Sequence, residues 1–191
     1  MTNHLPISYN DRTLFHLLRH FSLVNANAIQ CLIGRGYNQA LIDENLQIPG
    51  SKFHEFFATD IKSLLLQSAT IKETASFRQN GYLHVSYEFD TLNFPEGIGT
   101  LGIISLEALK SLTSNQPVLK KNRGRLLLHA TVSKLPITNL LTLVLKEQQT
   151  SNFLITAFPG AAALPLPSTK FSTEFNETCK LFWEQQVFLS L

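Results

Sequence analysis

The sequence is short of cysteine, of charge and of long apolar runs. Its two cysteines, Cys31 and Cys179, lie far apart and form no C-x-x-C pair, which excludes a disulfide framework. No apolar run reaches membrane-spanning length, and the opening MTNHLPISYNDRT has neither the basic nor the apolar region of a secretory signal. We therefore expect a cytoplasmic protein with reduced thiols and no membrane association, with export by another kind of signal left open.

Charged residues make up only 16% of the chain and the formal net charge is +2, which is too small to indicate a nucleic-acid-binding protein. Hydrophobic residues make up 44%, as in globular proteins. A chain of 191 residues fits one medium domain, or one domain with a small helical addition.

Apolar residues recur with a helical period from Asp11 to Leu66. Gly34-Arg35-Gly36 separates two short helices, and Ser51 is expected to be the N-cap of a long one. Residues 1–67 are therefore predicted to be a helical subdomain. The two expected core stripes are Leu14, Leu17, Leu18, Phe21 and Val24, and Phe53, Phe56, Phe57, Ile61, Leu64 and Leu65.

After Gln67 the period changes to two, which predicts strands at 71–77 and 83–89 joined at Asn80-Gly81. A two-residue loop pairs Phe77 with His84, and a three-residue loop pairs Phe77 with Val85. The longer loop matches apolar faces, so the pattern favours it.

Three more strands are predicted at 126–133, 140–146 and 153–158, in an antiparallel meander because the loops between them are short. A last amphipathic helix is expected over 172–189. The predicted fold class is α+β: an N-terminal helical subdomain, then a twisted antiparallel sheet packed by helices on one face and open on the other, over 68–191. The two parts are expected to form one compact unit.

Several sequence motifs lack the surrounding residues that their chemistry requires. GIGTLG at 97–102 matches a dinucleotide fingerprint, but no buried strand precedes it and no helix opens within it, so it is read as a flexible turn. His16 and His20 have metal-ligand spacing, yet Arg12 and Arg19 near the same face favour a solvated basic surface. The sequence contains no G-x-S-x-G elbow. We predict no metal site and no cofactor.

A basic loop followed by a strand is the strongest candidate site. Strand alternation places Leu127, His129 and Thr131 on one face and an apolar set on the other. A histidine beside fixed cations suits metal-independent cleavage of an RNA phosphodiester, which needs proton transfer near neutral pH and positive charge at phosphorus. The same pattern also fits a structural alternative, in which the histidine is a half-exposed strand residue and the basic loop is only solvated. The cations expected to bind substrate phosphate are Lys120, Lys121, Arg123 and Arg125.

The helices, the histidine after a basic loop and the late strand LITAFPG together resemble the barnase, EndoU, colicin and RelE-like ribonuclease superfamily, over about residues 68–160. The resemblance implies that His129 is the catalytic histidine and Thr156 the late hydroxyl. In a simple meander the strand at 140–146 lies between them and holds them about 10 Å apart. Thr131 is the alternative hydroxyl.

The sequence thus predicts a metal-independent endoribonuclease of toxin or effector type, which cleaves tRNA or mRNA by attack of the 2′-hydroxyl. A neutralising protein partner is expected for such a toxin. The alternative is a non-catalytic interaction module whose basic surface binds an acidic protein or RNA. The sequence leaves the oligomeric state open.

Overall fold

The structure is a computed structural model that describes residues 6–21, 26–46, 50–113, 119–122, 125–128 and 135–189. The fold is α+β, as the sequence predicts. The chain forms two units: Met1–Thr100 with Ile137–Ala162 (unit 1), and Leu101–Pro136 with Ala163–Leu191 (unit 2). This division differs from the predicted boundary between residues 67 and 68, because the N-terminal helices share one core with the large sheet.

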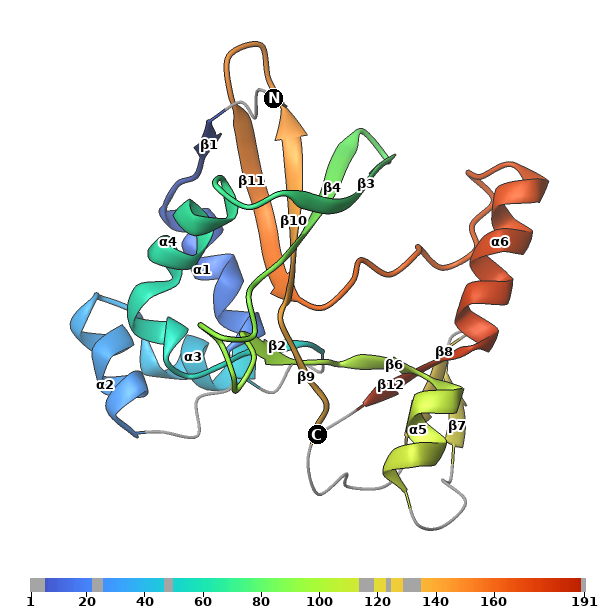
Figure 1. Ribbon diagram of the computed structural model, residues 1–191, viewed down its shortest axis with the longest axis horizontal. Helices are drawn as coiled ribbons and strands as arrows, with labels where there is room; N and C mark the ends of the chain where they lie inside the picture. The colour runs from blue at the N-terminus through green and yellow to red at the C-terminus, as the bar shows by residue number, and fades with distance from the viewer. Residues whose placement is uncertain are drawn as a thin grey trace. The chain divides into compact units, whose positions relative to one another are not determined.

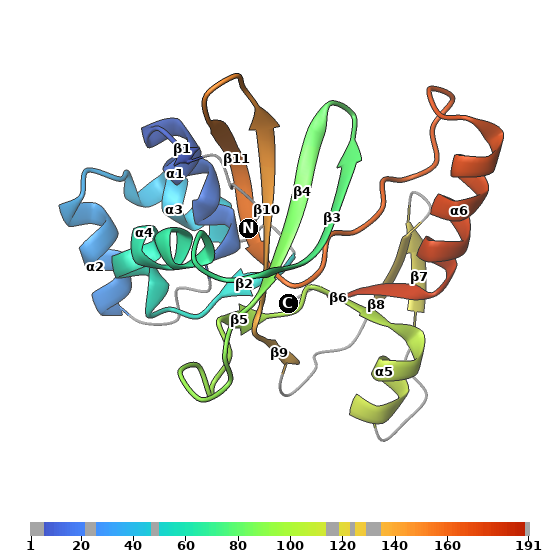
Figure 2. The same ribbon diagram turned by 45° about the horizontal axis from the view of Figure 1, so that its top comes forward.

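Unit 1 combines helices with a five-stranded sheet. The elements are β1 (Ile7–Ser8), α1 (Asp11–Leu17), the 3-10 turn η1 (Leu18–His20), α2 (Ala26–Gly34), α3 (Gln39–Leu46), α4 (Phe57–Ser68), β3 (Glu73–Gln79), β4 (Tyr82–Glu88), β10 (Leu140–Glu147) and β11 (Asn152–Pro159). The strand order is β1-β11-β10-β4-β3, and every neighbouring pair is antiparallel except β1 with β11. Figures 1 and 2 show helices α1 to α4 on one side of this sheet.

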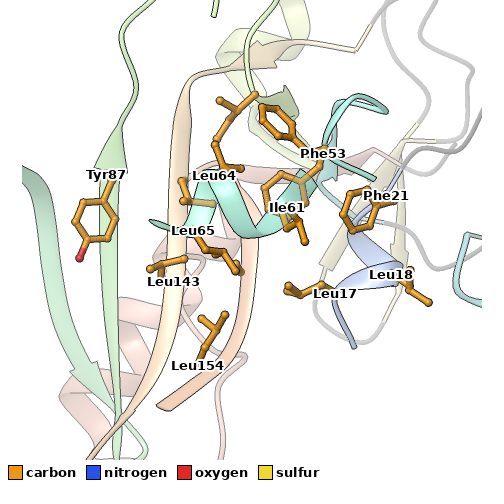
Figure 3. Close-up of a cluster of buried hydrophobic side chains, with 14 of the residues drawn as sticks. Leu17, Leu18, Phe21, Phe53, Ile61, Leu64, Leu65, Tyr87, Leu143 and Leu154 are labelled. Carbon is orange, nitrogen blue, oxygen red and sulfur yellow. The ribbon is translucent and has the colours of Figure 1, made fainter. Parts of the chain in front are cut away.

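The core of unit 1 lies between that sheet face and the helices. Alternation along the strands turns Leu143, Leu145 and Leu154 toward the helices, and each is at most 2% exposed. Figure 3 shows Leu143 and Leu154 beside Leu64 and Leu65 of α4. The helical stripes predicted from the sequence are therefore confirmed in large part, but Phe56 is 64% exposed, and Val24 lies outside the described residues. Other buried members of this cluster are Leu17, Leu18, Phe21, Phe53, Phe57 and Ile61.

The loop between β3 and β4 has two residues, so the predicted three-residue loop is wrong. Asn80 and Gly81 have φ of 51° and 78°, the left-handed pair that a tight hairpin turn requires. Phe77 consequently pairs with His84. The Phe77 ring stacks on the His84 ring across this pair, and the register shifts only farther along, between Glu73 and Ala75.

The segment after Ser51 begins as a strand, which corrects the predicted helix N-cap at that residue. β2 (Lys52–Phe53) pairs with β5 (Gly99–Thr100), which in turn pairs with β9 (Ile137–Thr138). Phe53 is 0% exposed and joins the core from this strand, and α4 begins only at Phe57.

The GIGTLG segment contains the buried strand β5, so the prediction of a flexible turn is wrong there. Gly97 has a φ of 73°, which favours glycine. A Cβ at Gly99 would lie 2.6 Å from Pro159 Cγ and would also meet the Lys52 carbonyl oxygen. Glycine is needed at Gly99 because β5 packs directly against neighbouring backbone.

Unit 2 is a smaller sheet with a helix on each face. Its elements are β6 (Ile103–Ser105), α5 (Leu106–Leu112), β7 (Leu119–Asn122), β8 (Arg125–Leu128), α6 (Thr173–Glu184) and β12 (Gln186–Leu189), with strand order β6-β12-β8-β7. Leu109 of α5 packs with Leu128 and Val187 on one face. On the other face Trp183 of α6 stacks on Phe188.

Two predictions about this part of the chain are wrong. The strand expected over 126–133 does not belong to the large sheet, because β4 pairs directly with β10 and β8 pairs with β7 and β12. The helix expected over 172–189 ends at Glu184. Val187 and Leu189 are buried on one face of β12 and Phe188 lies on the other, which is a strand pattern.

Candidate functional site

The β7–β8 hairpin brings predicted cations of the basic loop together in unit 2. Lys120 pairs with Leu127, and Asn122 pairs with Arg125. Paired residues share a face and alternate residues of a strand return to it, so Lys120 and Arg125 lie on the same face, as diagonal neighbours. Lys120 is exposed. Lys121 belongs to β7 as well, and it pairs with Leu126.

Arg125 is held by two aromatic rings. Its guanidinium carbon lies 5.3 Å from the ring centroid of Trp183 and 4.9 Å from that of Phe188. The two rings stack on each other at 5.5 Å with an interplanar angle of 7°. Cation–π contacts of this kind contribute about 0.5–2 kcal/mol each. The stack fixes the direction of the guanidinium, since the indole N–H is itself bonded to the carbonyl of Pro165 at 3.0 Å.

Sequence analysis missed this aromatic support. The predicted continuous helix over 172–189 gave no role to Trp183 or Phe188. A period of two after Glu184 was the signal that could have revealed the strand and the stack.

His129, Thr131 and Arg123 lie outside the described residues. Their proposed roles therefore rest on the sequence alone. The face of β8 that carries Arg125 and Leu127 was expected to be open, whereas α6 covers part of it through Trp183.

Thr156 lies on β11 in unit 1, whereas the hairpin cations belong to unit 2. Its Oγ1 is buried and has no hydrogen-bond partner in the described part of the chain. Thr156 pairs with Val144, which pairs on its other side with His84. Thr156 and His84 therefore share a sheet face, one strand apart, on the side opposite the helices.

His84 is a candidate that sequence analysis did not select, because a single histidine on a strand is an ordinary feature. Its ring stacks on Phe77 at 4.7 Å and 9°. Burial lowers the pKa of His84 below its usual value. Its Nδ1 is buried and makes no hydrogen bond to any described residue.

The predicted solvated basic face near the N-terminus is only partly correct. Arg12 is exposed, but burial lowers the pKa of His20 to about 4, so this ring is neutral at pH 7. Its ring lies 5.7 Å from that of Phe158. His16 is half-buried, and its pKa is lowered by burial and then by the charge of Arg19.

Within the described ranges, no group of three or more histidine, cysteine, aspartate or glutamate side chains could hold a metal ion. No helix in those ranges is long and apolar enough to span a membrane. No family model, curated protein or solved structure matches the chain.

Proposed function

We propose that the protein is a metal-independent endoribonuclease of toxin or effector type. The observation that carries the proposal is the β7–β8 hairpin, where exposed Lys120 and ring-supported Arg125 share one face. An arginine with a fixed fork and a neighbouring lysine suit a phosphodiester, which offers oxygen acceptors with negative charge. The resemblance of the sequence to the ribonuclease superfamily implies the reaction, which is cleavage of an RNA phosphodiester.

The proposed reaction needs proton transfer and charge stabilisation. The 2′-oxygen of RNA loses its proton and bonds to phosphorus, and the bond from phosphorus to the 5′-oxygen breaks. The leaving 5′-oxygen takes up a proton, and a 2′,3′-cyclic phosphate remains on the upstream fragment. His129 is proposed for proton transfer, the hairpin cations stabilise the charge on phosphorus, and Thr131 supplies a hydroxyl to the substrate.

A non-catalytic module that binds RNA or an acidic protein is the second candidate. One observation favours it: Arg125 is held against the rings of Trp183 and Phe188 beside exposed Lys120, an arrangement that binds an anion without any proton transfer. In this case the hairpin binds its partner through charge alone.

The test is incubation of the purified protein with total cellular RNA in a chelating buffer. We expect discrete fragments with cyclic phosphate ends. The double variant Lys120→Gln, Arg125→Gln should weaken RNA binding and flatten its salt dependence, by about 0.7 units of log–log slope for each lost phosphate contact. Lys146→Gln, at an exposed residue of β10, is the matched control.

RNA that is bound with this salt dependence but stays intact would support the binding module. RNA that is neither bound nor cut, over a wide range of protein concentration, would contradict the ribonuclease and would leave, of the second candidate, only the binding of an acidic protein.

A further inference from the structure

A group of basic side chains lies where η1 meets β2 in unit 1. Lys52 is 3% exposed, and its Nζ donates a hydrogen bond to the carbonyl oxygen of Arg19 at 2.6 Å. His20 donates its Nδ1–H to the carbonyl oxygen of Ser51 at 3.2 Å. These two hydrogen bonds join the end of η1 to the start of β2. The Lys52 ammonium and the His20 ring are therefore held beside the backbone of Arg19.

The surrounding packing is rigid. Gly99 leaves no room for a Cβ against the Lys52 carbonyl oxygen and Pro159, so the backbone beneath Lys52 is tightly confined. The aromatic ring of Phe158 lies against the ring of His20, at 5.7 Å between centroids. A ligand at this cluster would therefore meet a preformed surface.

The positive charge of Arg19 has no described counter-charge. Arg19 is half-buried, and its Nε is buried without a hydrogen-bond partner. Throughout the described ranges its guanidinium forms no ion pair and no hydrogen bond. A guanidinium is always charged at physiological pH, so the cost of holding it here falls when an anion approaches.

Lys52 adds a second cation to the same place. Burial, and then the charge of Arg19, lowers the pKa of Lys52 to about 8, so its ammonium group is still mostly charged at pH 7. His20 is neutral at that pH because of its burial. Two neighbouring cations beside a neutral ring favour the approach of an anion.

We propose that Arg19 binds a phosphate group through its guanidinium, with the fixed charge of Lys52 behind it. The planar fork of arginine matches two phosphate oxygens, and the buried ammonium strengthens the local positive potential without needing to touch the ligand. The phosphate comes either from free phosphate or from the backbone of RNA. The site lies in unit 1 and goes beyond the function proposed for the hairpin of unit 2.

The experiment uses the full chain and two probes at constant ionic strength: inorganic phosphate and a short single-stranded RNA. Binding is measured by calorimetry and by the shift of the melting temperature, with sodium chloride as the reference salt. Arg19→Gln keeps a polar side chain of similar reach but removes the charge. Arg12→Gln removes an exposed arginine of α1 and is the matched control.

We expect phosphate to raise the melting temperature of the wild type and of Arg12→Gln, and Arg19→Gln to bind phosphate at least tenfold more weakly. Affinity should also fall above pH 8, as Lys52 loses its proton. Loss of RNA binding alone in Arg19→Gln would assign the site to an RNA backbone phosphate. Equal affinity of Arg19→Gln and the wild type for both probes, or no binding of either, would overturn the proposal.

Discussion

At the residue scale, five described side chains have a buried polar atom without a hydrogen-bond partner: Arg19, His84, Arg125, Asn152 and Thr156. Leaving such an atom without a hydrogen bond costs about 1–3 kcal/mol. In Arg125 the contacts with two aromatic rings offset part of this cost. For His84 and Thr156 no described hydrogen bond does so. His84, Asn152 and Thr156 all lie on strands of the large sheet, so their unsatisfied atoms are the points of that sheet where a bound molecule has most to contribute.

The burial of His20 predicts how the stability of the protein depends on pH. Burial lowers its pKa from 6.5 to about 4, so the unfolded chain takes up the proton first as the pH falls. Acidification from pH 6.5 to pH 4 therefore lowers the free energy of unfolding, by up to about 3 kcal/mol from this group. His20→Asn retains a donor for the Ser51 carbonyl but does not titrate. Urea denaturation at pH 7, 5.5 and 4 should show the wild type losing stability relative to this variant, and parallel pH profiles would contradict the assignment.

At the element scale, the sequence predicts an element well where burial and turn chemistry agree. The hairpin of β10 and β11 was found within one residue at each end, because both strands alternate and the loop between them is short. The turn at Asn80-Gly81 was misjudged because β3 is an edge strand whose residues are mostly exposed. Hydrophobic matching says little there, and the turn residues decide the register.

The two glycines Gly81 and Gly34 test that reading of the turn. Neither has any atom within 4 Å of an added Cβ, so the substitution to alanine isolates the backbone effect. Gly81 has a φ of 78°, and Gly81→Ala should destabilise the protein by about 1–2 kcal/mol. Gly34 ends α2 with an ordinary φ, and Gly34→Ala should stabilise by about 0.4–1 kcal/mol. Chemical denaturation measures both, and equal effects would contradict the left-handed turn.

At the scale of the whole molecule, the chain passes between its units after Thr100, Pro136 and Ala162. Each unit is thus assembled from segments that are far apart in the sequence. The crossing after Ala162 lies in the Ala- and Pro-rich stretch at 159–167, but composition does not show which distant segments join in one unit. Part of the candidate site was predictable, since Lys120 and Arg125 lie close together in the chain. Its aromatic support was not, because α6 reaches the hairpin only through the fold.

The central claim is that the protein cuts RNA with His129 as its proton-transfer group. The direct measurement is RNA cleavage in chelating buffer together with thermal melting, on the same preparations of wild type, His129→Ala and His54→Ala, which removes an exposed histidine of unit 1. We predict that His129→Ala lowers cleavage by about 10²- to 10⁴-fold and leaves the melting temperature nearly unchanged. His54→Ala should match the wild type in cleavage. A His129→Ala protein with a lower melting temperature and normal specific activity would contradict the claim, as would a wild type that leaves RNA intact.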